Sequence, residues 1–215
     1  DAVENKRKWV YGITGVAVIA AIYGVTLIQT AGNLTADFNK NKQIYKDVKY
    51  FERTVGGVVP LDIIIDTTRE GGVERLSTLR RIEQLQDSLN TMPQLSRSGS
   101  IVDFVKFAKQ GVMFGNPDLY ELPSRSEQQW LLTYLPRGMK DESGLANSMA
   151  TADGRKARIS VQMADLTTPE MRVLTDKVKR LVSQIFPGDN FDVSITGASI
   201  KFIRSTSYLI NNLIL

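Results

Sequence analysis

Two pairs of carboxylates are the groups in this sequence whose types and spacing come closest to acid–base or metal chemistry. Asp62 is followed by Asp66, and Asp118 by Glu121, but neither pair has a partnering base or a plausible set of metal ligands. The chain has no His and no Cys, so the usual general base, thiol nucleophile and zinc ligands are all missing. We therefore interpret both pairs as solvated surface charge, and we expect no catalytic, cofactor-binding or metal site. An enzyme is the least favoured class.

A group of apolar and aromatic side chains is a better candidate for binding. Three of them lie in a loop marked by Gly and Pro, and two lie on the helix predicted after it. Apolar ligands need concave apolar walls with few polar groups, so these side chains are candidates for lining a substrate path. The simpler interpretation is that they pack the core of the domain. The five residues are Met113, Phe114, Tyr120, Trp130 and Tyr134.

Composition limits the partners of the chain. It has 215 residues and a formal net charge of +4, from 27 Lys and Arg against 23 Asp and Glu. Part of the excess is a single cluster, Lys6-Arg7-Lys8. Basic residues do not alternate with aromatic residues in a stripe, which argues against nucleic-acid binding. The length suffices for one sizeable domain, or for two small packed ones, after the apolar opening.

The opening of the chain carries the strongest apolar signal. From Trp9 to Ile28 there are 20 residues without a charge, which is about the length needed to cross a hydrocarbon core of roughly 30 Å. A signal peptide has a shorter apolar core, so the sequence predicts a transmembrane helix over 9–30. The basic cluster before it places the amino end in the cytoplasm. Small residues along this helix favour packing against other helices, and a lone anchor is the alternative.

The rest of the chain alternates between strand and helix patterns. Apolar residues with a period of two predict strands over 58–67, 155–165 and 191–196. Apolar stripes at spacings of three and four predict long helices over 73–89 and 168–185. This order favours an α+β sandwich with helices on one face of an open sheet. A ferredoxin-like arrangement is the economical solution.

Local signals place shorter helices around this framework. Ser100 with Asp103, and Ser124 with Glu127, resemble capping boxes that open two helices in the irregular region. An amphipathic helix before the first strand ends at Gly56-Gly57.

We divide the chain into parts on this basis. We also expect it to be an excerpt of a longer polypeptide, because it begins without Met and ends inside the apolar stretch SYLINNLIL. The parts are a cytoplasmic basic flank (1–8), a transmembrane helix (9–30), a linker with an amphipathic helix (31–57), an extracytoplasmic porter-like α+β domain (58–197) and the start of a second transmembrane helix (198–215).

An ordered set of short motifs resembles a known family of transporters. The motifs are Phe51-Glu52-Arg53, Gly56-Gly57, Pro60-Leu61-Asp62-Ile63, Arg158-Ile159-Ser160, Ala164-Asp165 and Ile195-Thr196-Gly197-Ala198-Ser199, which leads into the second apolar helix. In this order they resemble the resistance-nodulation-division (RND) superfamily. The resemblance is closest to its branch of predicted exporters related to the large mycobacterial membrane proteins. It covers essentially all 215 residues.

The resemblance implies a function. The chain would be one outer domain, with its flanking helices, of a proton-driven, multi-pass transporter in the bacterial inner membrane. Residues 31–197 would lie on the periplasmic side and pass hydrophobic or amphiphilic, lipid-like substrates. Its partners would be the lipid bilayer, the substrate and further membrane helices of the same polypeptide. Those helices would carry the proton relay, and assembly of identical copies is left open.

Two other functions remain open at this point. Secretion-assisting members of the same superfamily share a similar outer fold and handle unfolded exported chains. A sensor or interaction domain held between two membrane helices is the third interpretation.

The junction before the last helix contains the remaining candidate residues. Gly197 is a candidate hinge between the outer domain and the membrane, or a turn residue that needs unusual backbone angles. Lys201 and Arg204 lie about one turn into the last helix, where they would reach water or lipid headgroups.

Overall fold

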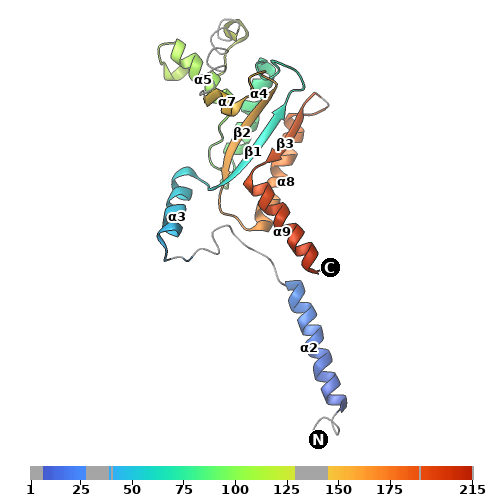
Figure 1. The fold of residues 1–215 in the computed structure, drawn as a ribbon. Coiled ribbons are helices and arrows are strands. Elements are labelled where there is room, and N and C mark those ends of the chain that lie inside the picture. Colours follow the sequence, from blue (N-terminus) through green and yellow to red (C-terminus); the bar gives the residue numbers. More distant parts are fainter. Residues whose placement is uncertain (1–6, 28–38, 40, 129–144, 189, 215) are drawn as a thin grey trace. The chain divides into compact units, whose positions relative to one another are not determined.

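The computed structural model contains two units, Asp1–Gly32 and Asn33–Leu215 (Figure 1). The first unit holds α2 (Arg7–Leu27), whose described side chains are all exposed. Within the described part of the chain, no helix combines the length and the apolar content that a bilayer crossing requires. The membrane spans predicted over 9–30 and 198–215 are not confirmed. The structure describes residues 7–27, 39, 41–128, 145–188 and 190–214.

The second unit is built on a three-stranded antiparallel sheet in the order β2–β1–β3. Ile63, in the middle of β1, pairs with Ile159 of β2 on one side and with Ile195 of β3 on the other. Because side chains alternate along a strand, this register gathers one apolar set on one face of the sheet. All three predicted strands are present: β1 (Val59–Asp66), β2 (Lys156–Met163) and β3 (Asp192–Thr196).

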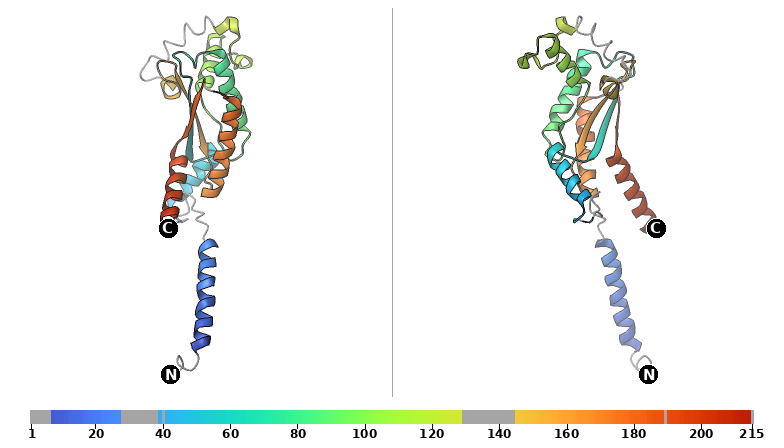
Figure 2. Two further views of the ribbon diagram at one scale, coloured as in Figure 1. Left: turned by 90° about the vertical axis from the view of Figure 1, so that its right-hand side faces the viewer. Right: turned by 60° about the vertical axis from the view of Figure 1, so that its left-hand side comes forward.

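Two long helices cover one face of this sheet. They are α4 (Leu76–Asn90) and α8 (Thr168–Ile185), and Figure 2 shows both on the same side of the strands. Their apolar stripes meet the inward side chains of β1 and β2 in one buried core, which confirms the α+β class. The core includes Leu61, Ile63, Ile65, Leu79, Ile82, Leu85, Leu89, Ile159, Val161, Met163, Met171 and Val178.

The helix α4 begins later than its apolar stripe predicts. The stripe starts at Val73, but Val73 lies in a turn where its N–H donates to the carbonyl of Gly154 at 2.9 Å. Gly71 makes a similar bond to Asp153, also at 2.9 Å. These two bonds hold the loop before α4 against the turn before β2, and the helix starts at Leu76. Val73 is nevertheless buried, which is why it fits the apolar period.

A segment between α4 and α5 (Ile101–Val112) runs along the outer edge of β2. The N–H of Ser96 donates to the carbonyl of Gln162 at 2.7 Å, and Gly99 exchanges two backbone hydrogen bonds with Ser160 at 2.9 Å. Residues 94–99 pair with β2 through isolated bridges and form no continuous strand in the described chain. The ferredoxin-like arrangement, which needs a fourth strand, is therefore not confirmed.

The shorter elements follow the predicted local signals. The capping box of Ser100 and Asp103 opens α5, and Ser124 donates its backbone N–H to Glu127 Oε2 at 2.7 Å before a helical turn at 125–128. The predicted amphipathic helix is α3 (Gln43–Val55), which ends at Gly56 with φ +85°. The remaining elements are η1 (Pro117–Leu119), α7 (Leu145–Met149) and α9 (Ala198–Ile214).

Candidate functional site

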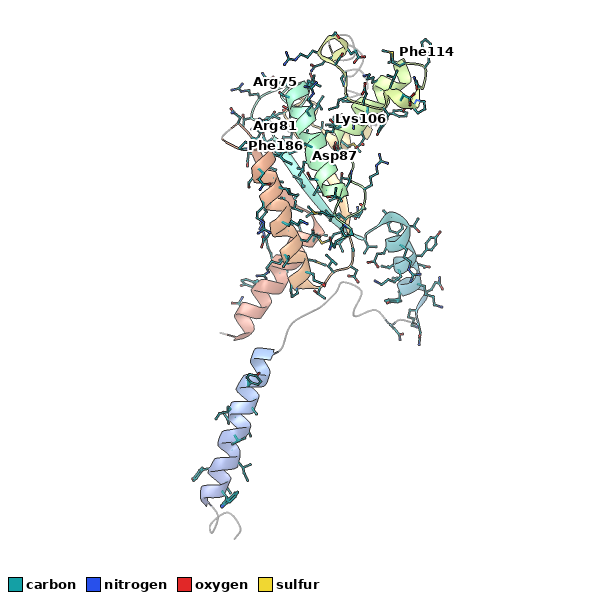
Figure 3. The ribbon with its side chains drawn as sticks, turned by 180° about the vertical axis from the view of Figure 1, so that it is seen from behind. Arg75, Arg81, Asp87, Lys106, Phe114 and Phe186 are labelled. Atoms are coloured by element: carbon teal, nitrogen blue, oxygen red, sulfur yellow. The ribbon has the colours of Figure 1, made fainter. Side chains whose placement is uncertain are left out.

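The first three residues of the predicted substrate path lie at and after the end of α5. Met113 follows the last residue of α5 and is half-buried. Phe114 is completely exposed, has φ +57°, and lies at the outer end of this region in Figure 3. Tyr120 lies further along, directly after η1. The other two, Trp130 and Tyr134, lie outside the described residues.

Tyr120 is held against α5. Its hydroxyl donates to Asp103 Oδ1 at 3.3 Å, and Lys106 Nζ lies 5.8 Å from the centre of its ring. Burial and the neighbouring Asp103 carboxylate raise the pKa of Tyr120 above its usual value. The structure thus separates an anchored Tyr120 from an exposed Phe114, and the substrate path remains a prediction.

A buried lysine holds the loop between α5 and the 125–128 turn in place. Lys109 has 2% of its surface exposed, and its Nζ lies 3.0 Å from Glu121 Oε1 and 3.1 Å from Glu127 Oε2. Burial alone would lower the pKa of Lys109, but the hydrogen bonds and charges of the two glutamates outweigh it and raise the pKa. Sequence reasoning missed this cluster. Its only sign was a lysine in register with the apolar face of α5.

The two carboxylates of β1 are ion-paired, which corrects their interpretation as solvated charge. Arg158 of β2 donates two hydrogen bonds, of 2.9 and 3.0 Å, to the carboxylate of Asp62. Arg155 lies 2.9 Å from Asp66, and this hydrogen bond lowers the pKa of Asp66. Arg158 lies on the neighbouring strand and Arg155 directly precedes it, so these pairs favour the observed register of β1 and β2. Among the described residues, no group of three His, Cys, Asp or Glu side chains could hold a metal ion.

A groove of about 420 Å³ lies beside the first turns of α8. Val173, one of its lining residues, is 69% exposed although it is a large apolar residue. Its lining combines apolar side chains with a few polar and charged ones. Sequence reasoning missed it, and its only signal was Val173 standing outside the buried stripe of α8. The groove is lined by Gln94, Leu166, Pro169, Glu170, Val173, Leu174 and Lys177.

The junction between β3 and α9 is a tight backbone crossing. Gly197 has φ +116°, and a Cβ there would lie 2.5 Å from the carbonyl oxygen of Pro60 in β1. The hydroxyl of Ser199, in the first turn of α9, donates to the same oxygen at 3.1 Å. The start of α9 is therefore bonded directly to the central strand. Gly197 has the unusual backbone angle that a turn residue would need, and its role as a hinge stays a prediction.

Comparison with known proteins identifies the family. A family model described as the MMPL family matches residues 37–208. The chain belongs to the MMPL family. The match runs from before α3 into α9 and includes the whole sheet, whereas α2 lies outside it. No curated protein matches the chain.

MMPL membership confirms the coarse part of the resemblance. Members of this family are transporters of the RND type, and they are membrane proteins rather than enzymes. The predicted branch and the two flanking helices of this MMPL chain are not confirmed.

Two exposed cations of α9 were predicted to contact lipid headgroups. Lys201 and Arg204 are both exposed. Arg204 also lines a small pocket of about 120 Å³ between α8 and α9, together with Asp176 and Lys179 of α8. Their exposure leaves both side chains accessible, and the contact with headgroups stays a prediction for this MMPL protein.

Proposed function

We propose that this chain is the outer domain of an RND-type transporter that moves hydrophobic or amphiphilic, lipid-like molecules. The observation that carries the proposal is the MMPL family match, which runs from residue 37 to residue 208 and includes the whole sheet. Proton flow through membrane helices outside this chain supplies the energy.

The proposed topology places α2 and α9 in the bilayer. The 20 uncharged residues from Trp9 to Ile28 support this for α2, and so do its exposed apolar side chains. Trp9, Ile13 and Ile19 are each at least 65% exposed, and such a surface calls for lipid or other helices to cover it. Residues 31–197 then lie on the periplasmic side of the inner membrane.

We further propose that the outer domain is ferredoxin-like, as in a porter domain. The strand order and the placement of α4 and α8 on one face support this. Residues 94–99, paired with β2 at its outer edge, would represent the fourth strand.

The groove on α8 is the proposed contact for substrate. Its volume of about 420 Å³ suits part of an acyl chain, since small-molecule sites commonly measure about 300–1,000 Å³. Leu166, Val173 and Leu174 offer apolar surface to a chain. Glu170 and Lys177 stand at the same groove, where they would meet a polar headgroup.

Movement would reach this groove through the β3–α9 junction. Because Ser199 and Gly197 contact Pro60 directly, a displacement of α9 pulls on the central strand of the domain. Gly197 would act as the hinge that transmits it.

The test is transport of fluorescent lipid by the complete transporter in proteoliposomes. We expect uptake that an uncoupler abolishes. Val173→Asp should reduce uptake at least tenfold, because it places a charge among the apolar lining residues at an exposed position that folding tolerates. Val112→Asp is the matched control: Val112 is 45% exposed at the end of α5, outside the groove, and should leave uptake unchanged.

Uptake that persists with an uncoupler would refute the proton drive. Uptake that survives deletion of residues 58–197 would refute the role of the outer domain.

A further inference from the structure

A polar pocket of about 220 Å³ lies at the end of the sheet opposite α9. Here β1 ends at Asp66, α4 begins at Leu76, and the chain enters β3 at Asp192, whereas α9 follows the other end of β3. The side chains around it are hydroxyl, amide and guanidinium groups. It is lined by Thr67, Arg69, Gly72, Arg75, Ser77, Thr78, Asn190 and Phe191.

The pocket has positive charge without a balancing carboxylate. Arg69 and Arg75 are both exposed, and neither forms an ion pair within the described chain. None of the described residues that line the pocket is acidic. A third guanidinium lies near the pocket, because that of Arg81 is 5.2 Å from the ring centre of Phe191, one of the lining residues. Figure 3 shows Arg75 and Arg81 along the same helix.

The pocket also receives the amino end of α4. This helix has 15 residues, and Arg75 at its N-cap provides no side-chain cap. Among the described residues no acceptor is found for the backbone N–H groups of Leu76 and Ser77. The free N–H groups and the helix dipole together give this end a partial positive charge.

A nearly buried threonine, whose hydroxyl has no hydrogen-bond partner among the described residues, lies at the same place. Thr78 is only 3% exposed, yet its hydroxyl makes no hydrogen bond to any described residue. A polar side chain with so little exposed surface normally has a hydrogen-bond partner. Since Thr78 lines the pocket, a ligand there is positioned to accept this hydrogen bond.

The loop beside the pocket is closely packed around Thr67. The Thr67 hydroxyl lies 2.7 Å from the carbonyl of Arg155 and 2.9 Å from that of Arg69. Gly72 passes so close that a Cβ there would lie 2.1 Å from the same hydroxyl. These contacts hold the backbone of this loop against the chain just before β2.

We propose that this pocket binds an oxyanion of the phosphate type. Guanidinium groups match phosphate oxygens with paired N–H donors, and a helix amino end adds backbone donors aimed at the same point. The hydroxyls of Ser77 and Thr78 complete the donor set. The proposal does not depend on the transport function, since the phosphate group of a lipid and free inorganic phosphate present the same oxygens.

Amide NMR of the 215-residue chain in an uncharged detergent tests the site. Inorganic phosphate is the probe, and chloride at equal ionic strength controls for screening. We expect saturable, phosphate-specific shifts at the amides of Leu76, Ser77 and Thr78.

Three variants locate the binding. Arg75→Gln should weaken phosphate binding at least tenfold, which corresponds to about 1.4 kcal/mol. Thr78→Val, which keeps the buried shape, should weaken it by about tenfold as well. Arg180→Gln is the matched control, because Arg180 is exposed on α8 outside the pocket. The phosphate affinity of this variant should equal that of the unaltered chain.

Shifts that are equal in phosphate and chloride would overturn the proposal, and so would unchanged affinity in Arg75→Gln. Monomeric dihexanoyl phosphatidylglycerol distinguishes the sources. Saturation of the same amides at a lower concentration than inorganic phosphate supports the site and assigns it to lipid headgroups. Weaker or equal binding supports it as a site for free phosphate.

Discussion

Replacing Gly197 with alanine tests the close contact between α9 and the central strand. The new Cβ would lie 2.5 Å from the carbonyl oxygen of Pro60 and 3.2 Å from the Cα of Leu61, whereas real Cβ atoms essentially never approach closer than 3.0 Å. Both partners are backbone atoms of β1, which pairs on both sides in the sheet. The strand or the helix must therefore shift.

The expected loss of stability has three parts. Alanine at φ +116° costs roughly 1–2 kcal/mol, since side chains disfavour positive φ. Separation of α9 from β1 breaks the hydrogen bond from Ser199 to Pro60, worth about 1 kcal/mol. Strain in β1 adds about 1 kcal/mol. We expect the free energy of unfolding to fall by about 3–4 kcal/mol.

Urea unfolding of the chain, followed by circular dichroism, measures this loss. Gly188→Ala is the matched control: Gly188 also has a positive φ of +86°, but a Cβ there meets no atom within 4 Å. It should lose only the backbone part, about 1–2 kcal/mol. Equal losses in the two variants would show that the contact with Pro60 is unimportant and refute the reasoning.

Other predictions concern the ion pairs. Lys109→Met should speed tryptic cleavage after Arg125 severalfold with little change in global stability, because Met keeps the buried stem and the carboxylates left behind reach solvent; unchanged cleavage would contradict it. Hydrogen bonds from Ser124, and then from Lys109, lower the pKa of Glu127 below its usual 4.5. The backbone amides of this loop should therefore be protected from hydrogen exchange above pH 4.5, and this protection should be lost as the pH falls through the lowered pKa. Arg158→Gln should cost no more than about 1 kcal/mol because its side chain is 43% exposed; a double-mutant cycle with Asp62→Asn that gives more than about 2 kcal/mol would disagree.

Local patterns predicted the elements that depend on local chemistry. The strand around Ile63 alternates because one face is buried, and the capping box at Ser100 needs only residues three apart. The late start of α4 could not be predicted, because the bond from Val73 reaches Gly154, far along the chain. The pairing of Asp62 with Arg158 depends on strand register, which no local pattern specifies.

The candidate binding regions were harder to predict for the same reason. Met113, Phe114 and Tyr120 were singled out as apolar types, but the structure places Phe114 in solvent and Tyr120 against Asp103. The groove around Val173 and the pocket around Thr78 combine residues from distant segments. Only the packing of α4 and α8 on the sheet brings those segments together.

The irregular segment along β2 has a consequence for how this protein avoids self-association. An unpaired strand edge is a template on which other chains can polymerise. Residues 94–99 occupy that edge with isolated bridges, and Pro93 precedes them without an amide hydrogen to offer. At the opposite edge β3 has just five residues and begins with the charged Asp192. Both edges of the sheet are thus poor templates for fibril growth, which favours folding of the domain over aggregation.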